Sequence, residues 1–323
     1  MLARVAETLF WMSRYLERAE NMARLINVNA NLLLDIPKKT TLGWEPLIDI
    51  TGTREHYLIS NENFEERSVL RYLVSDVDSP VSIVSALKSA RENARTIRDV
   101  IPREAWEQIN ALNYYATDQL SAGLSKRGRF SYLKEIILRN QTISGLLAGT
   151  MNQDQGYLFI RMGRNLERAD MTTRIIDVRT ANLITNENME LRPFENIQWM
   201  SVLKSLTAYQ MYRQSMQARV RRGDVLKFLF QSKKFPRSIY FCAQQLEQCV
   251  LQLPNFDAVL HLIHALMDMV QGADLEAFDQ NQLHEFIDQC QIEFNAIHNA
   301  LVDNYFLSGR IYKQAPKQVQ KAS

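Results

Sequence analysis

The chain has 323 residues, 46% hydrophobic and 23% charged, which is the composition of a globular protein with a buried core. Its 11 glycines and 8 prolines fall well below the roughly 7% and 5% of an average protein, which argues against a many-stranded β protein and against extended disorder. With 38 Lys and Arg against 36 Asp and Glu, the net charge of +2 does not indicate a nucleic-acid-binding protein.

Helical periodicity runs along the chain, and no alternating pattern is long enough to anchor a sheet, so we predict an all-α protein. A loop with Gly43, Pro46 and Gly52 follows the first long helix. Pro80, Pro102 and Pro236 are expected in the first turns of helices, where the missing N–H has no cost. The expected helices are 2–34, 64–74, 80–100, one from 102, 129–152, 154–185, 195–217, 222–232, 236–253, 255–270 and 275–306.

Two sequence matches indicate an internal repeat. Residues 12–28 read MSRYLERAENMARLINV and agree with 162–178, MGRNLERADMTTRIIDV, at nine of 17 positions. Residues 69–83 read VLRYLVSDVDSPVSI and match 225–239, VLKFLFQSKKFPRSI, in the same order along the chain. We therefore expect a tandem duplication and a helical bundle of two pseudo-symmetric halves, 1–152 and 153–312, followed by a disordered tail at 313–323.

The repeated helix carries apolar residues on both of its faces. Its first face is apolar throughout: Val5, Leu9, Met12, Leu16, Ala19, Ala23 and Ile26. The opposite face mixes charged and apolar residues: Arg14, Glu17 and Arg18 lie among Phe10, Trp11, Leu25 and Val28. A merely solvated face would not alternate aromatic residues with arginines. We expect both faces to be covered, and the charges to be at least partly buried.

The charges on this helix need partners from elsewhere. Arg14 and Arg18 are four residues apart, which is unfavourable for like charges without an anion nearby. Glu17 can reach Arg14 at a spacing of three residues. Two favourable i,i+4 pairs are expected beside them: Glu20 with Arg24, and Asp170 with Arg174. One arginine on each helix is then left to find a carboxylate or phosphate, because a buried unpaired guanidinium would be very costly.

Two arrangements satisfy this requirement. In the first, the two repeated helices pack across a pseudo-twofold axis, so that Glu17 meets Arg168 and Glu167 meets Arg18. In the second, the guanidinium groups hold an anionic ligand or a carboxylate of a partner protein through bidentate hydrogen bonds. The sequence leaves both arrangements open.

Two tandem Leu-Glu-Arg-Ala helices, together with the segment at 79–95, resemble the bacterial alpha-E family over nearly the whole chain. That family is an all-helical domain named for a repeated Glu-Arg motif. The resemblance places the motif on Glu17-Arg18 and Glu167-Arg168, and a second polar segment on residues 91–95. The counterpart of this segment in the second half, QQLE at 244–247, keeps one acid and no arginine. The candidate binding residues are Arg14, Glu17, Arg18, Arg91, Glu92, Asn93, Arg95, Arg164, Glu167 and Arg168.

The resemblance also implies a context. Alpha-E proteins accompany circularly permuted ATP-grasp carboxylate–amine ligases, a transglutaminase-like protein and an amidohydrolase of the N-terminal-nucleophile type. The implied role is a non-catalytic helical component of a peptide synthesis or modification system. It would bind the ligase, or its anionic or peptide substrate, through the Arg/Glu face.

Motifs for catalysis by this chain are absent from the sequence. It has no phosphate-cradling glycine loop, no Gly-x-Ser-x-Gly elbow and no cysteine in a nucleophile context. His261 and His264 lie on one helical face with Asp268, but the sequence places no further strong ligand beside them. We therefore predict no metal and no cofactor. Two alternatives remain: an enzyme acting on an amide or amino-acid-like substrate with Glu17 or Glu167 as general base, and a scaffold whose Glu-Arg pairs only join the halves.

The cysteines and hydropathy indicate the compartment. Cys242, Cys249 and Cys290 fit neither a disulfide framework nor a zinc site, which is typical of a reducing environment. Glu7 lies where a signal peptide would carry an apolar run, and no stretch reaches 18 apolar residues. We expect a cytoplasmic protein with neither a membrane nor a nucleic acid as partner.

Overall fold

The computed structural model describes residues 1–35, 43–184, 195–216 and 219–306, and across these ranges the protein is all-α, as the sequence predicts. No strand occurs within them. The tail expected at 313–323 lies outside the described residues. None of the helices in these ranges has an apolar stretch of the length that a membrane crossing requires.

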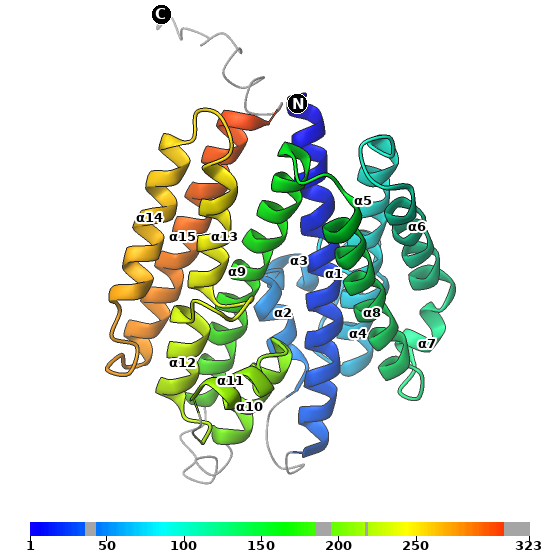
Figure 1. Ribbon diagram of the computed structural model, residues 1–323. Coiled ribbons are helices and arrows are strands. Elements are labelled where there is room, and N and C mark those ends of the chain that lie inside the picture. Colours follow the sequence, from blue (N-terminus) through cyan, green and yellow to red (C-terminus); the bar gives the residue numbers. More distant parts are fainter. Residues whose placement is uncertain (36–42, 185–194, 217–218, 307–323) are drawn as a thin grey trace, which may run out of the picture.

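Two long helices, α1 (Ala3–Asp35) and α9 (Gln155–Ile184), lie side by side at the centre of the molecule (Figure 1). Each buries residues on two faces. On α1, Leu9 and Phe10 are both fully buried although they point in different directions. This confirms that both faces of the repeated helix are covered.

The other helices are arranged around this pair (Figure 1). Those on the α1 side are α5 (Ile83–Thr96), α6 (Arg103–Asp118), α7 (Leu120–Leu124) and α8 (Arg129–Thr150). Those on the α9 side are α13 (Ile239–Val250), α14 (Asp257–Gly272) and α15 (Gln280–Tyr305). Shorter helices complete the fold: α2 (Glu45–Thr51), α3 (Arg54–Leu58), α4 (Glu66–Leu70), the π-helical turn η1 (Arg71–Ser75), α10 (Glu195–Ser205), α11 (Tyr209–Met216) and α12 (Arg222–Gln231). As a result, α5 packs on α1, and α13 packs on α9.

Three expectations about helix boundaries are wrong. The expected loop around Pro46 contains α2, which has Pro46 in its first turn and Gly52 as its C-cap, whose φ of 66° suits glycine. The helix expected at 195–217 is two helices, because the chain bends at Thr207, which has a φ of 54°. Pro80 and Pro236 lie two residues before the N-caps of α5 and α13, which are serines. A serine Oγ can accept a backbone N–H of the first turn, so serine rather than proline begins each helix.

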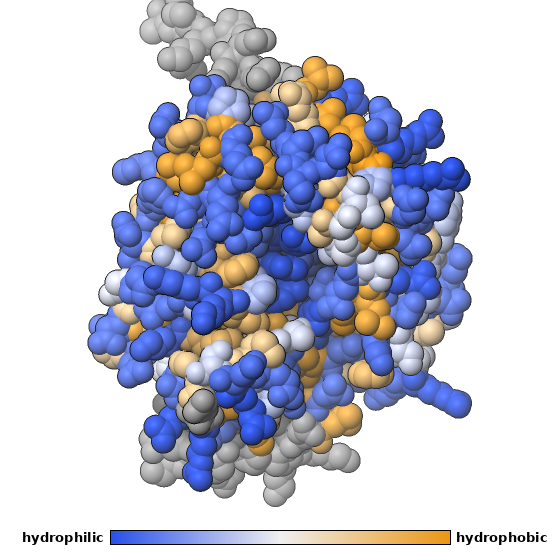
Figure 2. All heavy atoms as spheres, in the orientation of Figure 1, coloured by the Kyte–Doolittle hydropathy of each residue, from blue (hydrophilic) through white to orange (hydrophobic). Residues whose placement is uncertain are grey.

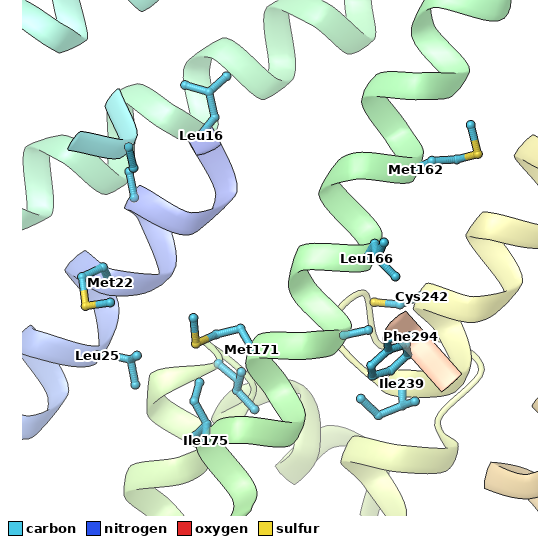
Figure 3. Packing of buried hydrophobic residues seen from close by; sticks show 14 of the residues in the cluster. Leu16, Met22, Leu25, Met162, Leu166, Met171, Ile175, Ile239, Cys242 and Phe294 are labelled. Carbon is cyan, nitrogen blue, oxygen red and sulfur yellow. The ribbon is translucent and has the colours of Figure 1, made fainter. Parts of the chain in front are cut away.

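The core is continuous from α1 through α9 to α13 and α15 (Figure 3). Met22 and Leu25 of α1 belong to it together with Met171 and Ile175 of α9. On the far side of α9, Leu166 lies near Cys242 of α13 (Figure 3). Cys242 is fully buried and belongs to this core. The origin of this arrangement by duplication stays a prediction.

Candidate functional site

The Glu167 carboxylate of α9 is surrounded by two arginines of α1. Arg14 Nε donates to its Oε2 at 2.7 Å, and Arg18 donates from Nε to Oε1 at 2.6 Å and from Nη2 to Oε2 at 3.0 Å. Glu167 is only 2% exposed. The anion that Arg14 and Arg18 require is therefore supplied by the other repeated helix, and Arg14 pairs with Glu167 rather than with Glu17.

The Glu17 carboxylate of α1 is held in a related way, with one difference. Arg168 Nε of α9 donates to Oε1 at 2.9 Å, which completes the second crossed pair. The same oxygen also accepts from Arg237 Nη1 at 2.7 Å. Arg237 precedes the N-cap of α13 and reaches across to α1, where it also contacts Asn21 Oδ1 at 2.8 Å and Glu20 Oε1 at 3.1 Å.

Arg237 belongs to the site but is not among the candidate residues from the sequence. In the second sequence match it stands opposite Val81, so it departs from the repeat instead of belonging to it. That departure is the only signal for it in the sequence. The two expected i,i+4 pairs are present, with Arg24 Nη2 at 2.6 Å from Glu20 Oε1 and Arg174 Nε at 2.9 Å from Asp170 Oδ2.

These contacts keep both motif carboxylates ionised. Burial would raise the pKa of Glu17, but Arg168 and Arg237 outweigh it and hold this pKa at about 2. Burial acts on Glu167 in the same sense, and Arg18 and Arg14 hold its pKa at about 2. Burial lowers the pKa of Arg237 below its ordinary value. The motif is thus a desolvated, charge-paired network that joins α1 to α9.

Arg164 differs from Arg14, its counterpart in the repeat. Its Nε is buried and has no hydrogen-bond partner among the described residues. It borders a cavity of about 10 Å³ between α1, α8 and α9, together with Glu17 and Asn140, whose Oδ1 is also buried without a partner. That volume holds about one water molecule. Figure 2 shows the molecule, in the orientation of Figure 1, hollowed near its centre, with hydrophilic residues inside the hollow.

The second polar segment forms a separate network on α5 and α6. Arg91 Nε donates to Asn110 Oδ1 at 2.7 Å, and Arg91 Nη1 donates to Glu92 Oε1 at 2.6 Å. Arg95 Nε donates to the other oxygen of Glu92 at 2.9 Å. Within the described ranges, none of these bonds reaches the motif carboxylates. The structure therefore brings six of the ten candidate residues together and leaves residues 91–95 outside the cluster.

Two of those residues, Glu92 and Asn93, border a groove whose aromatic side chains contact the motif arginines. This α1–α5 groove has a volume of about 650 Å³ and is lined by Arg4, Glu7, Thr8, Trp11, Tyr15, Val77, Ser85, Lys88, Ser89, Glu92 and Asn93. The rings of Trp11 and Tyr15 stack with their centroids 5.6 Å apart. The Cζ atom of Arg14 lies 5.1 Å from the centroid of the Trp11 ring, and the Cζ atom of Arg18 lies 5.6 Å from the centroid of the Tyr15 ring. The arginines that Glu167 holds thus lie against the aromatic wall of the groove.

A second hollow borders Arg18 itself. This Val81 pocket has a volume of about 220 Å³ and is lined by Arg18, Met22, Thr51, Thr53, Pro80, Val81, Glu167, Asp170, Met171 and Arg174. A larger hollow of about 890 Å³ between α4 and α7 contains none of the candidate residues.

Two histidines outside the motif network, His264 and His284, have carboxylate partners. His264 Nε2 lies 2.7 Å from Glu247 Oε1, and His284 Nδ1 lies 2.7 Å from Asp177 Oδ1. No group of three metal-binding side chains occurs in the part of the chain that the structure describes. Burial raises the pKa of the Cys242 thiol to about 12, which keeps it protonated and unreactive.

The chain is similar to a known protein family along most of its length. A family model described as a predicted alpha-helical domain with a conserved ER motif matches residues 1–306. Uncharacterised proteins of Mycobacterium bovis and of Mycobacterium tuberculosis are each 24% identical over 274 residues, which are 78% of this chain and 30% of those proteins. The chain thus spans less than a third of the length of these relatives. No solved structure is significantly similar to it.

Proposed function

The chain belongs to the Alpha-E family, and on this premise we propose that it is a non-catalytic helical component of a bacterial peptide synthesis or modification system. Its partner is a circularly permuted ATP-grasp carboxylate–amine ligase, with a transglutaminase-like protein as a further partner. The α1–α5 groove binds the ligase or its anionic or peptide substrate, and the Glu-Arg network holds that groove in shape.

The chemistry of the α1–α5 groove carries this proposal. Its volume of about 650 Å³ lies within the roughly 300–1,000 Å³ of ligand-binding clefts. Arg4 and Lys88 border it together with Glu7 and Glu92. Glu92 is paired with Arg91 and Arg95, whereas neither Arg4 nor Lys88 makes a side-chain hydrogen bond or an ion pair among the described residues, so both are available to a carboxylate. Trp11 and Tyr15 offer flat rings for apolar side chains. A peptide segment with an acidic group matches this combination.

The network has a positioning role in this proposal. Glu167 fixes Arg14 and Arg18, and these guanidinium groups lie against the rings of Trp11 and Tyr15. Both oxygens of Glu167 are already engaged within the protein. The motif itself therefore has little capacity left for a ligand, and the groove beside it is the better binding surface.

The enzyme alternative has less support. A general base works best when its pKa lies near the operating pH. Glu17 and Glu167 have pKa values held at about 2, and their oxygens accept hydrogen bonds from arginines. Neither carboxylate is suited to removing a proton from a substrate near neutral pH.

The size of the relatives supports a role beside other domains. In the two mycobacterial proteins the matching region is only 30% of the chain. The same helical body thus occurs covalently joined to further polypeptide, which is consistent with a component that works in contact with a partner.

Co-purification with the circularly permuted ATP-grasp ligase of the same organism tests the proposal. We expect the double variant Arg4→Ala/Lys88→Ala to bind the ligase at least about tenfold more weakly, because the groove loses both free cations. The matched control is Arg103→Ala/Lys126→Ala, which removes the same two residue types at exposed positions outside the groove. Absence of a complex with the wild-type chain, or equal weakening by both double variants, would contradict it.

A scaffold role is the second candidate, favoured by the crossed pairs between α1 and α9. It predicts that Arg18→Ala and Arg168→Ala lower the free energy of unfolding without changing the affinity of the folded variants for the ligase. The groove proposal instead expects Arg18→Ala to weaken binding, because Tyr15 loses its support.

A further inference from the structure

The segments that precede α5 and α13 have the same local structure. The Oγ of Ser82 caps α5 by accepting the backbone N–H of Ser85, and it donates to the carbonyl of Asp76. The Oγ of Ser238 caps α13 and donates to the carbonyl of Ser232, again six residues earlier. Helix α5 packs on α1 in the same way that α13 packs on α9. Val81, which precedes the N-cap of α5, therefore corresponds in position to Arg237, which precedes the N-cap of α13.

These two places face matching residues of the repeated helices. Arg237 contacts Glu17, Glu20 and Asn21 on α1. In the sequence match, the residues of α9 at these positions are Glu167, Asp170 and Met171. All three line the Val81 pocket together with Val81 itself. The space that the Arg237 guanidinium fills in one half is therefore an open pocket of about 220 Å³ in the other.

The charges around the two places correspond except at Arg14, whose counterpart Arg164 makes no ion pair with Glu17 within the described ranges. Beside Arg237, Arg168 holds Glu17 and Arg24 holds Glu20. Beside the Val81 pocket, Arg18 and Arg14 hold Glu167, and Arg174 holds Asp170. Arg14 thus occupies Glu167, and the carboxylate left for a further guanidinium is Asp170, whose counterpart Glu20 binds both Arg24 and Arg237.

Acceptors for a further cation are present in the Val81 pocket. Asp170 uses Oδ2 for Arg174, and its Oδ1 makes no hydrogen bond within the described ranges. The hydroxyl of Thr53, which shares a hydrogen bond of 2.7 Å with Thr51, borders the same pocket. The pocket is smaller than the roughly 300 Å³ at which drug-sized sites begin, and it suits one side chain rather than a large cofactor.

We propose that the Val81 pocket binds a guanidinium group from outside the chain, in the position that Arg237 fills in the matching half. The guanidinium belongs to free arginine or to an arginine side chain of a peptide. This site is separate from the α1–α5 groove, and it stands whether or not the groove binds a ligase.

Titration of the full-length chain with N-ethylguanidine, followed by calorimetry or ligand-observed NMR, tests the proposal. We expect saturable binding at about 1 mM or tighter, and weaker binding of n-butylamine, which has no planar fork of donors. Propionate probes the opposite chemistry, because Arg18 and Arg174 also border the pocket. Saturable binding of propionate with none of N-ethylguanidine would overturn the proposal.

Two variants place the binding in this pocket. Val81→Arg supplies the side chain that the matching half already has, and we expect it to abolish N-ethylguanidine binding. The control Val100→Arg adds the same charge at an exposed position and should leave binding unchanged. Asp170→Asn, which does not depend on fitting a new side chain, is expected to weaken binding at least about tenfold. Binding that survives Asp170→Asn, or that Val100→Arg reduces as much as Val81→Arg, would contradict the site.

Free arginine and a short arginine-containing peptide then distinguish the two sources of the guanidinium. Tighter binding of the peptide, abolished by Val81→Arg, assigns the site to a peptide side chain. Tighter binding of free arginine assigns it to the amino acid.

Discussion

Arg237 Nη1 lies 2.7 Å from Glu17 Oε1, although the two residues are 220 positions apart in the chain. This contact places Glu17 between Arg168 of α9 and an arginine that the repeat does not contain. Arg164, which corresponds to Arg14, is left with a buried Nε and no partner for it in the described part of the protein. The two halves of the network thus differ by one arginine.

Removing the charge of Glu167 should strongly destabilise the protein. Glu167→Gln leaves Arg14 and Arg18 in a buried site without their anion, and we expect the free energy of unfolding to fall by about 3–5 kcal/mol. Urea denaturation followed by circular dichroism measures this. Glu107→Gln is the control, because Glu107 is 53% exposed and its pair with Arg103 is worth at most about 1 kcal/mol. Similar losses in the two variants would show that the network is not effectively buried.

Arg164 should substitute for Arg237. In Arg237→Ala, the nearby Arg164 guanidinium can turn to Glu17, so we expect a smaller loss of stability than in Glu167→Gln. The double variant Arg164→Ala/Arg237→Ala should then lose more than the sum of the two single variants, by about 0.5–3 kcal/mol. Urea denaturation of all four proteins completes the cycle, and additive losses would rule out this substitution.

Acid should destabilise the protein in the range where Glu17 and Glu167 take up protons. Their pKa values of about 2 lie below the ordinary value of 4.5. The folded state therefore binds protons less readily than the unfolded chain, and the stabilisation is fully present above pH 4.5 and is lost as the pH falls toward 2. Each carboxyl accounts for about 3 kcal/mol. The slope of unfolding free energy against pH should be shallower in Glu167→Gln than in the wild type below pH 4.5.

His298 should make the stability of the folded protein depend on pH in a second range, above that of the two glutamates. It stacks on Phe10, and burial, together with the nearby Arg14, lowers its pKa from 6.5 to about 4. The unfolded chain therefore takes up this proton first, so stability is lost as the pH falls from 6.5 toward 4. His298→Phe should be less sensitive to pH in this window, measured as the urea midpoint at pH 7 and pH 5. An unchanged pH dependence would place the loss at another group.

The cysteines should be unreactive in the folded protein. Burial raises the pKa of Cys249 to about 11 and the pKa values of Cys242 and Cys290 to about 12. Since the thiolate is the reactive form, a disulfide reagent at pH 8 should modify them only as fast as the protein opens. Modification of three thiols at once in urea is the matching control. Rapid reaction of any one of them under native conditions would contradict their burial.

Long helices were predicted well because each carries its own periodic signal. The helices expected at 2–34 and 154–185 are observed as α1, at Ala3–Asp35, and α9, at Gln155–Ile184. The shorter α2, α3 and α7 have five to seven residues, too few for a period of 3.6 to be recognised. Contacts with the rest of the protein fix them, as the buried Leu47 and Ile48 of α2 illustrate.

The sequence by itself determined that this protein is helical, that α1 and α9 are covered on both faces, and that their arginines need carboxylates from elsewhere. Helix periodicity and the cost of a buried charge are local properties, so they can be recognised without coordinates. Only the tertiary structure decided which charges meet. The crossed pairs depend on the register of two helices about 150 residues apart, and the place of Arg237 depends on how α13 packs against α9. Arg237 has no counterpart in the repeat, so only the packing of α13 against α9 determines where its side chain lies.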